Sequence, residues 1–121
     1  CSIHSFRPGI CRVFPLGRIY EENRLDYFLQ VDGCAKENRS KIKVSKWLDT
    51  PELKKNQQFL IDWHAFRKKI ECILGEMSDE NQKKTITMFL LNTFYINPYD
   101  TEQDFYLQFY ARLDRIAQVI A

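Results

Sequence analysis

The sequence predicts an α+β fold: a small antiparallel β-meander (residues ~1–48) packed against three α-helices (~51–76, ~79–96, ~101–121). Two observations predict this class. Short apolar and β-branched segments separated by Pro and Gly fill residues 1–48, whereas apolar residues recur at three- and four-residue steps through residues 51–121. Strand-like segments therefore precede helical ones and do not alternate with them, which favours α+β over α/β.

Four segments are candidates for the strands. Residues 2–6 end at the turn signal Arg7-Pro8-Gly9, and residues 10–14 are apolar until Pro15 and Gly17 interrupt them. Residues 25–31 (LDYFLQV) form the strongest candidate, and Asp32-Gly33 bounds them. Residues 41–45 (KIKVS) alternate polar and apolar side chains, as a half-buried strand does.

Start and stop signals delimit the three helices. Thr50-Pro51-Glu52 supplies a hydroxyl cap, a proline at the first helical position and an acid in the first turn. Ser78, followed by Asp79 and Glu80, starts the second helix, and Asn97-Pro98 ends it. Asp100 and Gln103 resemble a capping box at the start of the third helix.

Length and composition predict a single globular domain, residues 1–121, excised or processed from a longer chain. A chain of 121 residues with 45% hydrophobic and 14% aromatic residues can build one core. No uninterrupted apolar stretch approaches the length of a membrane-spanning helix, so we expect no transmembrane segment.

The four cysteines, at positions 1, 11, 34 and 72, allow two disulfides or four free thiols, so the compartment stays open. Cys72 lies in a helical pattern, where we expect a buried free thiol. A mature bacterial lipoprotein begins with a lipid-bearing cysteine, and Cys1 stands at this position. An exported lipoprotein domain anchored through Cys1 is therefore one alternative hypothesis.

No motif indicates catalysis, a metal or a cofactor. Cys1, His4, Cys11 and Cys34 form a Cys₃His set, but only the spacing from Cys1 to His4 is short, which argues against zinc. His64 and Cys72 stand eight residues apart on a predicted helix, too far for a nucleophile–base pair. Glycine-rich phosphate loops, metalloprotease motifs and nucleophile elbows do not occur in the sequence, so we expect a non-enzyme without a cofactor.

Charge is unevenly distributed, although the net charge is only +2. Residues 36–69 contain ten basic and four acidic residues, whereas residues 71–104 contain seven acidic and two basic ones. In an extended segment, alternate residues point to the same side. The basic segment therefore predicts, as an alternative function, a nucleic-acid-binding domain that uses six residues: Arg39, Lys41, Lys43, Lys46, Trp47 and Lys54.

Aromatic residues cover more than one face of the third predicted helix. Either the sheet and the two neighbouring helices sandwich this helix, so that Phe105, Tyr106, Phe109 and Tyr110 are all core, or one set is core and the other meets a partner. Aromatic side chains are enriched at the centres of interfaces, which supports the second interpretation. We therefore expect Phe105, Phe109 and Tyr110 to contact a protein partner. The leading hypothesis is a non-catalytic binding domain, a protein–protein interaction module or a subunit of a larger assembly.

Overall fold

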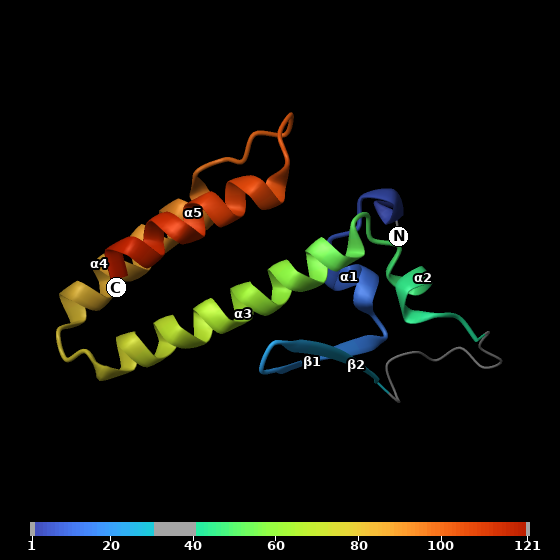
Figure 1. Ribbon diagram of the computed structural model, residues 1–121, viewed down its shortest axis with the longest axis horizontal. Helices are drawn as coiled ribbons and strands as arrows, with labels where there is room; N and C mark the ends of the chain where they lie inside the picture. Colours follow the sequence, from blue (N-terminus) through green and yellow to red (C-terminus); the bar gives the residue numbers. More distant parts are fainter. Residues whose placement is uncertain (1, 31–40, 121) are drawn as a thin grey trace. The chain divides into compact units, whose positions relative to one another are not determined.

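The computed structural model describes residues 2–30 and 41–120, and the chain divides into two compact units, Cys1–Ala65 (unit 1) and Phe66–Ala121 (unit 2). The division falls within helix α3 (Leu53–Glu76). Each unit has its own buried apolar residues: Val13 and Leu48 in unit 1, and Ile70, Phe94, Phe109 and Ile116 in unit 2. An antiparallel sheet and several helices make up the described chain, which confirms the predicted α+β class (Figure 1).

The sheet of unit 1 is a hairpin of β1 (Leu16–Glu21) and β2 (Arg24–Leu29). Glu21 pairs with Arg24, so Glu22 and Asn23 form a two-residue turn, and Asn23 takes a positive φ of 58° that asparagine tolerates well. Gly17 lies opposite Phe28, and the Phe28 ring occupies the space that a side chain at Gly17 would need. The prediction of a strand at residues 25–31 is confirmed for residues 25–29.

The other three predicted strands are wrong. Residues 2–6 contain a short 3₁₀ helix, η1 (His4–Phe6), and residues 10–14 lie largely in α1 (Gly9–Val13). Residues 41–43 have no regular structure, and α2 (Val44–Leu48) follows them. Over residues 2–30 and 41–120 the sheet is therefore a two-stranded hairpin and not a meander. The physical reason is tertiary, because α1 and α2 pack together and bury Val13 and Leu48, which outweighs a local strand preference.

One face of the hairpin meets the first part of α3. The rings of Tyr20 and His64 stack with centroids 4.2 Å apart, and the Gln57 Nε2 donates a hydrogen bond to the Tyr27 hydroxyl at 3.3 Å. Tyr20 and Tyr27 contact α3 because both side chains project from the same face of the hairpin. Figure 1 shows the hairpin beside this part of α3.

The long helices agree with the three predicted helical ranges. They are α3, α4 (Glu80–Leu91) with its π-helical continuation η2 (Asn92–Ile96), and α5 (Phe105–Ile120). In the described part of the chain, none of the helices combines the length and the apolar character needed to cross a membrane.

The helix starts differ from the predicted ones by a few residues. The Thr50 hydroxyl donates to the Leu48 carbonyl at 3.2 Å and caps nothing, while Glu52 has a positive φ of 49°, so α3 begins only at Leu53. The cap of α4 is Asp79, not Ser78, since the Asp79 carboxylate accepts from the amides of Asn81 and Gln82 at 2.8 and 3.3 Å.

The start of α5 also lies later than the capping-box pattern predicts. The Asp100 carboxylate accepts hydrogen bonds from the Glu102 amide and the Gln103 side chain, both at 2.9 Å, within the loop before the helix. The carboxylate that serves the first turn of α5 belongs to Asp104, which accepts from the Tyr106 amide at 3.0 Å. The predicted pair therefore orders the connection and not the helix terminus.

Unit 2 is built around aromatic rings. The Phe94 ring lies between those of Phe66 and Phe109, with both centroid distances at 5.7 Å. Ile116 on α5 is fully buried. The ring contacts join α3, η2 and α5 within the unit. The core of the unit therefore contains both aromatic rings and an aliphatic side chain.

Candidate functional site

The aromatic residues of α5 divide between core and surface. Phe109 is only 2% exposed and packs between Phe94 and Phe105, with the Phe105 centroid 6.1 Å away. Phe105 is 38% exposed, and Tyr110 is half-buried with its ring edge against Phe109 at 5.3 Å. Of the three predicted contact residues, Phe105 and Tyr110 thus reach the surface, whereas Phe109 supports them from inside.

A second apolar surface lies on α4 and η2, and the sequence prediction did not include it. Met88, Leu91 and Tyr95, which we call the α4 apolar surface, are 51%, 40% and 66% exposed. They recur at three- and four-residue steps and therefore share one side of the helix. The opposite side, with Ile86, Leu90 and Phe94, is the one that turns inward. The sequence contains a signal for this surface, because Met88, Leu91 and Tyr95 form a second series of three- and four-residue steps along the same predicted helix.

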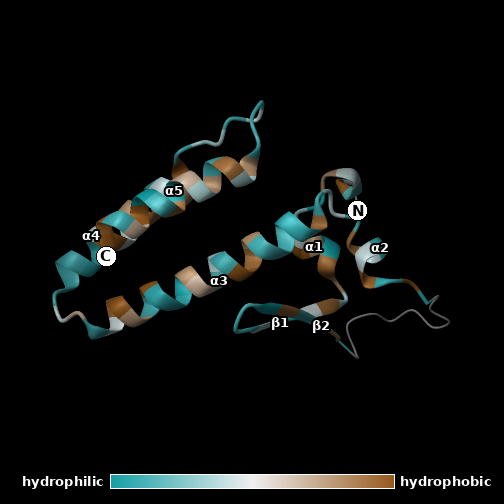
Figure 2. Ribbon diagram, viewed as in Figure 1, coloured by the Kyte–Doolittle hydropathy of each residue, from teal (hydrophilic) through white to brown (hydrophobic). Residues whose placement is uncertain are grey.

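Exposed apolar side chains are common throughout the described residues. Eighteen large apolar side chains are exposed there, against six buried apolar residues. They include Phe6 and Ile10 in unit 1 as well as Leu107 and Val119 on α5. Apolar segments accordingly recur along α1, α3 and α5 (Figure 2).

Only part of the predicted basic site lies in the described residues. Lys41, Lys43, Lys46 and Lys54 are exposed, whereas Arg39 lies outside the described residues. Residues 41–43 are not a strand, so the expected placement of Lys41 and Lys43 on one side of a strand is wrong. Trp47 is 40% exposed, and its indole N–H donates to the Phe14 carbonyl at 3.0 Å.

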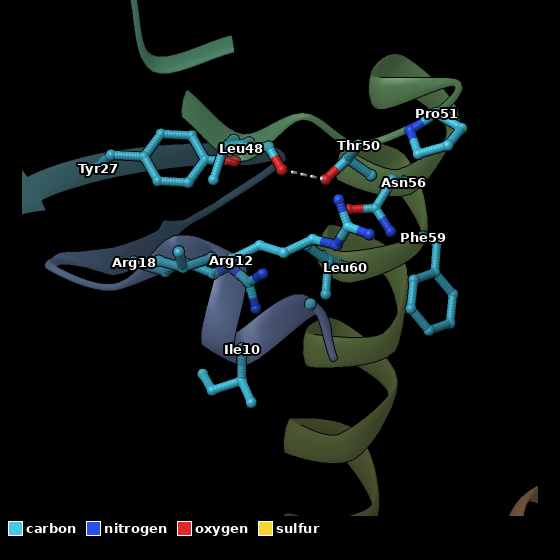
Figure 3. Close-up of a pocket in the computed structure, with 12 residues that line it drawn as sticks. Ile10, Arg12, Arg18, Tyr27, Leu48, Thr50, Pro51, Asn56, Phe59 and Leu60 are labelled. Atoms are coloured by element: carbon cyan, nitrogen blue, oxygen red, sulfur yellow. Dashed lines mark hydrogen bonds between the residues drawn. The ribbon is translucent and has the colours of Figure 1, made fainter. Parts of the chain in front are cut away.

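Unit 1 contains a pocket of about 360 Å³ that we call the arginine pocket. Residues of α1, the hairpin, the segment between α2 and α3, and α3 itself line it (Figure 3). Its polar lining comes from Arg12, Arg18, Tyr27, Thr50 and Asn56, and its apolar lining includes Ile10, Phe59 and Leu60. The sequence analysis missed it, because the lining residues are scattered over the chain and form no motif.

The two arginines of the pocket differ in their partners. Arg12 donates from Nε to the Arg7 carbonyl at 3.2 Å and from Nη1 to the Asp49 carbonyl at 2.7 Å. Its Nη1 also lies 3.9 Å from the Asp49 carboxylate. The Nε of Arg18, in contrast, is buried and has no hydrogen-bond partner among the described residues. Arg18 therefore holds an unsatisfied charged donor at the pocket.

The structure describes the surroundings of Cys11, Cys72 and His64. Cys72 is an exposed free thiol, so the prediction that it is buried is wrong; it lies on the outward side of α3, next to the exposed Glu71. Cys11 is also exposed, and the His64 ring stacks on Tyr20. No group of three or more potential metal ligands occurs in residues 2–30 and 41–120.

Two hypotheses depend on residues outside the described ranges. Cys1 and Cys34 both lie there, so the structure gives no geometry for the Cys1, His4, Cys11 and Cys34 set. The lipid-anchor hypothesis at Cys1 lies outside the described residues for the same reason.

Comparison with known proteins identifies no relative. No known protein family matches the chain, and neither a curated protein nor a solved structure does.

Proposed function

We propose that this chain is a non-catalytic binding domain, a protein–protein interaction module or a subunit of a larger assembly. The excess of exposed over buried large apolar side chains supports this proposal most strongly. Burying such a side chain is worth about 1.5–3 kcal/mol, so an isolated chain leaves a large driving force unused. Association with a protein partner would recover part of it.

In unit 2 the proposed contact is the α4 apolar surface, with Phe105 and Tyr110 of α5 as further contacts. Met88, Leu91 and Tyr95 combine thioether, aliphatic and aromatic groups on one helix side. Met and Tyr are enriched at the centres of protein interfaces, while charged residues are depleted there. The three residues of the α4 apolar surface carry no charge.

The test compares two variants that each remove exposed apolar groups. Met88→Ser combined with Leu91→Ser changes the α4 apolar surface, whereas Leu107→Ser changes a 73% exposed leucine on α5. We expect the wild-type chain to sediment above its 14.5 kDa monomer mass, or to co-purify with a protein from its natural source. The double variant should lose the association, and Leu107→Ser should retain it.

The outcome that contradicts this surface is equally specific. If the association persists unchanged in the double variant while circular dichroism shows native helix content, the α4 apolar surface is not the contact. On α5 the informative substitutions are Phe105→Ala and Tyr110→Ala. Phe109→Ala tests stability and not binding, because Phe109 is buried.

A second candidate function is nucleic-acid binding through unit 1. The observation that favours it is that Lys43, Lys46 and Lys54 are exposed and form no ion pair with the described residues, whereas the nearby Lys55 pairs with Glu52 at 2.7 Å. Unpaired lysines beside an exposed indole suit a phosphate backbone and a stacked base.

Salt dependence tests this second candidate. Affinity for a single-stranded oligonucleotide should fall steeply as salt rises, and Lys43→Gln with Lys46→Gln should reduce both the affinity and the slope. Lys55→Gln serves as the control, because Lys55 already has an acidic partner. Absence of binding at low salt would remove nucleic acid as a ligand.

A further inference from the structure

We propose that the arginine pocket of unit 1 binds one carboxylate group carried on a small apolar body. Three features of the pocket support this ligand class: an unsatisfied guanidinium, a charge balance that leaves room for one negative charge, and an apolar wall. The pocket lies in unit 1 and the α4 apolar surface in unit 2, so this inference does not depend on the proposed protein contact.

The fold directs Arg18 into the pocket. Arg18 pairs with Tyr27 across the hairpin, so both side chains project from the same face of the sheet. Tyr20, which stacks on His64 of α3, projects from this face as well. The Arg18 Nε is buried without a hydrogen-bond partner among the described residues. A buried charged donor that has lost its water is unfavourable until an acceptor replaces that water, and a carboxylate oxygen matches the fork of a guanidinium.

The charge balance of the pocket favours a single negative charge. The guanidinium of Arg12 already donates to two carbonyls and has the Asp49 carboxylate 3.9 Å away. Arg18 forms no ion pair with the described residues, which leaves one uncompensated positive charge. A carboxylate carries one negative charge at neutral pH, whereas a phosphate monoester carries between one and two.

The remaining lining fits an apolar body with one polar end. The Tyr27 hydroxyl accepts from Gln57 at 3.3 Å, so its own proton is left to donate to a ligand oxygen. Ile10, Phe59 and Leu60 provide the apolar wall. The volume of about 360 Å³ lies at the lower end of the range for small-molecule sites.

The test uses phenylacetate as the probe and phenylacetamide as its uncharged counterpart, which keeps the apolar body and removes the charge. Nuclear magnetic resonance of the nitrogen-15-labelled full chain records the titration. We expect phenylacetate to shift the Arg18 Nε–Hε signal and the Tyr27 and Asn56 amides in a saturable manner. Phenylacetamide should bind at least about 10-fold more weakly, because it lacks the charge-assisted hydrogen bonds.

Matched variants assign the effect to Arg18. Arg18→Gln should weaken phenylacetate binding about 10- to 100-fold, the loss expected for hydrogen bonds between charged groups. Arg24→Gln removes the same charge from the same hairpin, but Arg24 is 63% exposed and pairs with Glu21 and Asp26. Binding in the Arg24 variant should stay within twofold of the wild-type value, estimated from the small contribution of exposed ion pairs.

Four results would overturn the proposal. They are the lack of a saturable shift in the wild type, equal affinity for phenylacetamide, tighter binding of inorganic phosphate, and an equal loss in Arg24→Gln. If Arg18→Gln loses its dispersed amide spectrum, Arg18→Lys replaces it. That variant keeps the charge but loses the planar fork, so its affinity should fall at least several-fold, and unchanged affinity would overturn the assignment to Arg18.

Discussion

Three backbone carbonyl groups converge on the guanidinium of Arg112. Its Nη1 donates to Thr93 and Asn97 at 2.7 and 2.8 Å, and its Nη2 donates to Pro98 at 2.7 Å. The same group lies 3.8 Å from the centroid of the Tyr99 ring. Arg112 therefore satisfies backbone carbonyl groups that have no helical partner where the π-helical segment ends.

Replacing Arg112 should destabilise unit 2. We expect Arg112→Ala to lower the free energy of unfolding by about 2–3 kcal/mol, because several charge-assisted hydrogen bonds are lost together. Urea unfolding followed by circular dichroism measures the change. The control is Arg115→Ala, an exposed residue of α5 that should change stability by no more than about 0.5 kcal/mol. Similar small values for both variants would contradict the capping role of Arg112.

Burial raises the pKa of Tyr99 above the usual phenol value of ~10, and the nearby Arg112 charge offsets only part of that increase. The folded protein therefore holds this proton more tightly than the unfolded chain does. The contribution of Tyr99 to stability should be constant below pH ~10 and should be lost as pH rises through the higher pKa of folded Tyr99. Absorbance of ionised phenol, measured as wild type minus Tyr99→Phe, gives the pKa. A difference curve centred below 10 would be inconsistent with it.

The length of a helix decides whether the sequence predicts it. The three long helices were predictable because their apolar residues recur at helical steps over many turns. The short helices α1 and α2 were not, since five residues cannot display a helical period and the packing of Val13 and Leu48 decides them. Likewise, β1 continues across Gly17, where the Phe28 ring from the paired strand occupies the side-chain space of the glycine.

The cap of α4 provides a test at the same level. Asp79→Ala removes the acceptor for the Asn81 and Gln82 amides and should cost about 1 kcal/mol in unfolding free energy. Asp79→Ser keeps a capping oxygen and should retain most of that stability. Thermal unfolding of both variants distinguishes them. Equal melting temperatures would show that the cap contributes nothing measurable.

On the scale of the whole molecule, the two units have separate sets of buried residues. The division between the units falls inside one helix, where the sequence shows neither a linker nor a change in composition, so the prediction of a single domain stays a prediction. The candidate sites also depend on tertiary contacts that the sequence does not show. Aromatic enrichment drew attention to α5, but the burial of Phe109 depends on Phe94, and the arginine pocket depends on contacts between distant segments.

A core substitution should act mainly on its own unit. Ile116→Ala removes a fully buried side chain and should destabilise unit 2 by about 2–5 kcal/mol. Hydrogen exchange should accelerate in α4 and α5, with a smaller change in the amides of β1 and β2. Val119→Ala is the control, because Val119 is 65% exposed on the same helix. Equal acceleration in the hairpin would show that the units unfold as one.

The aromatic ring over Gly17 gives the hairpin a spectroscopic signature. A proton held against the face of a benzene ring experiences the ring current, which moves its resonance upfield. Because the Phe28 ring occupies the side-chain space of Gly17, the α-protons of this glycine are placed to feel that current while β1 and β2 are paired. Their resonances therefore report whether β1 and β2 are paired, and they should lose the upfield shift when denaturant opens the hairpin.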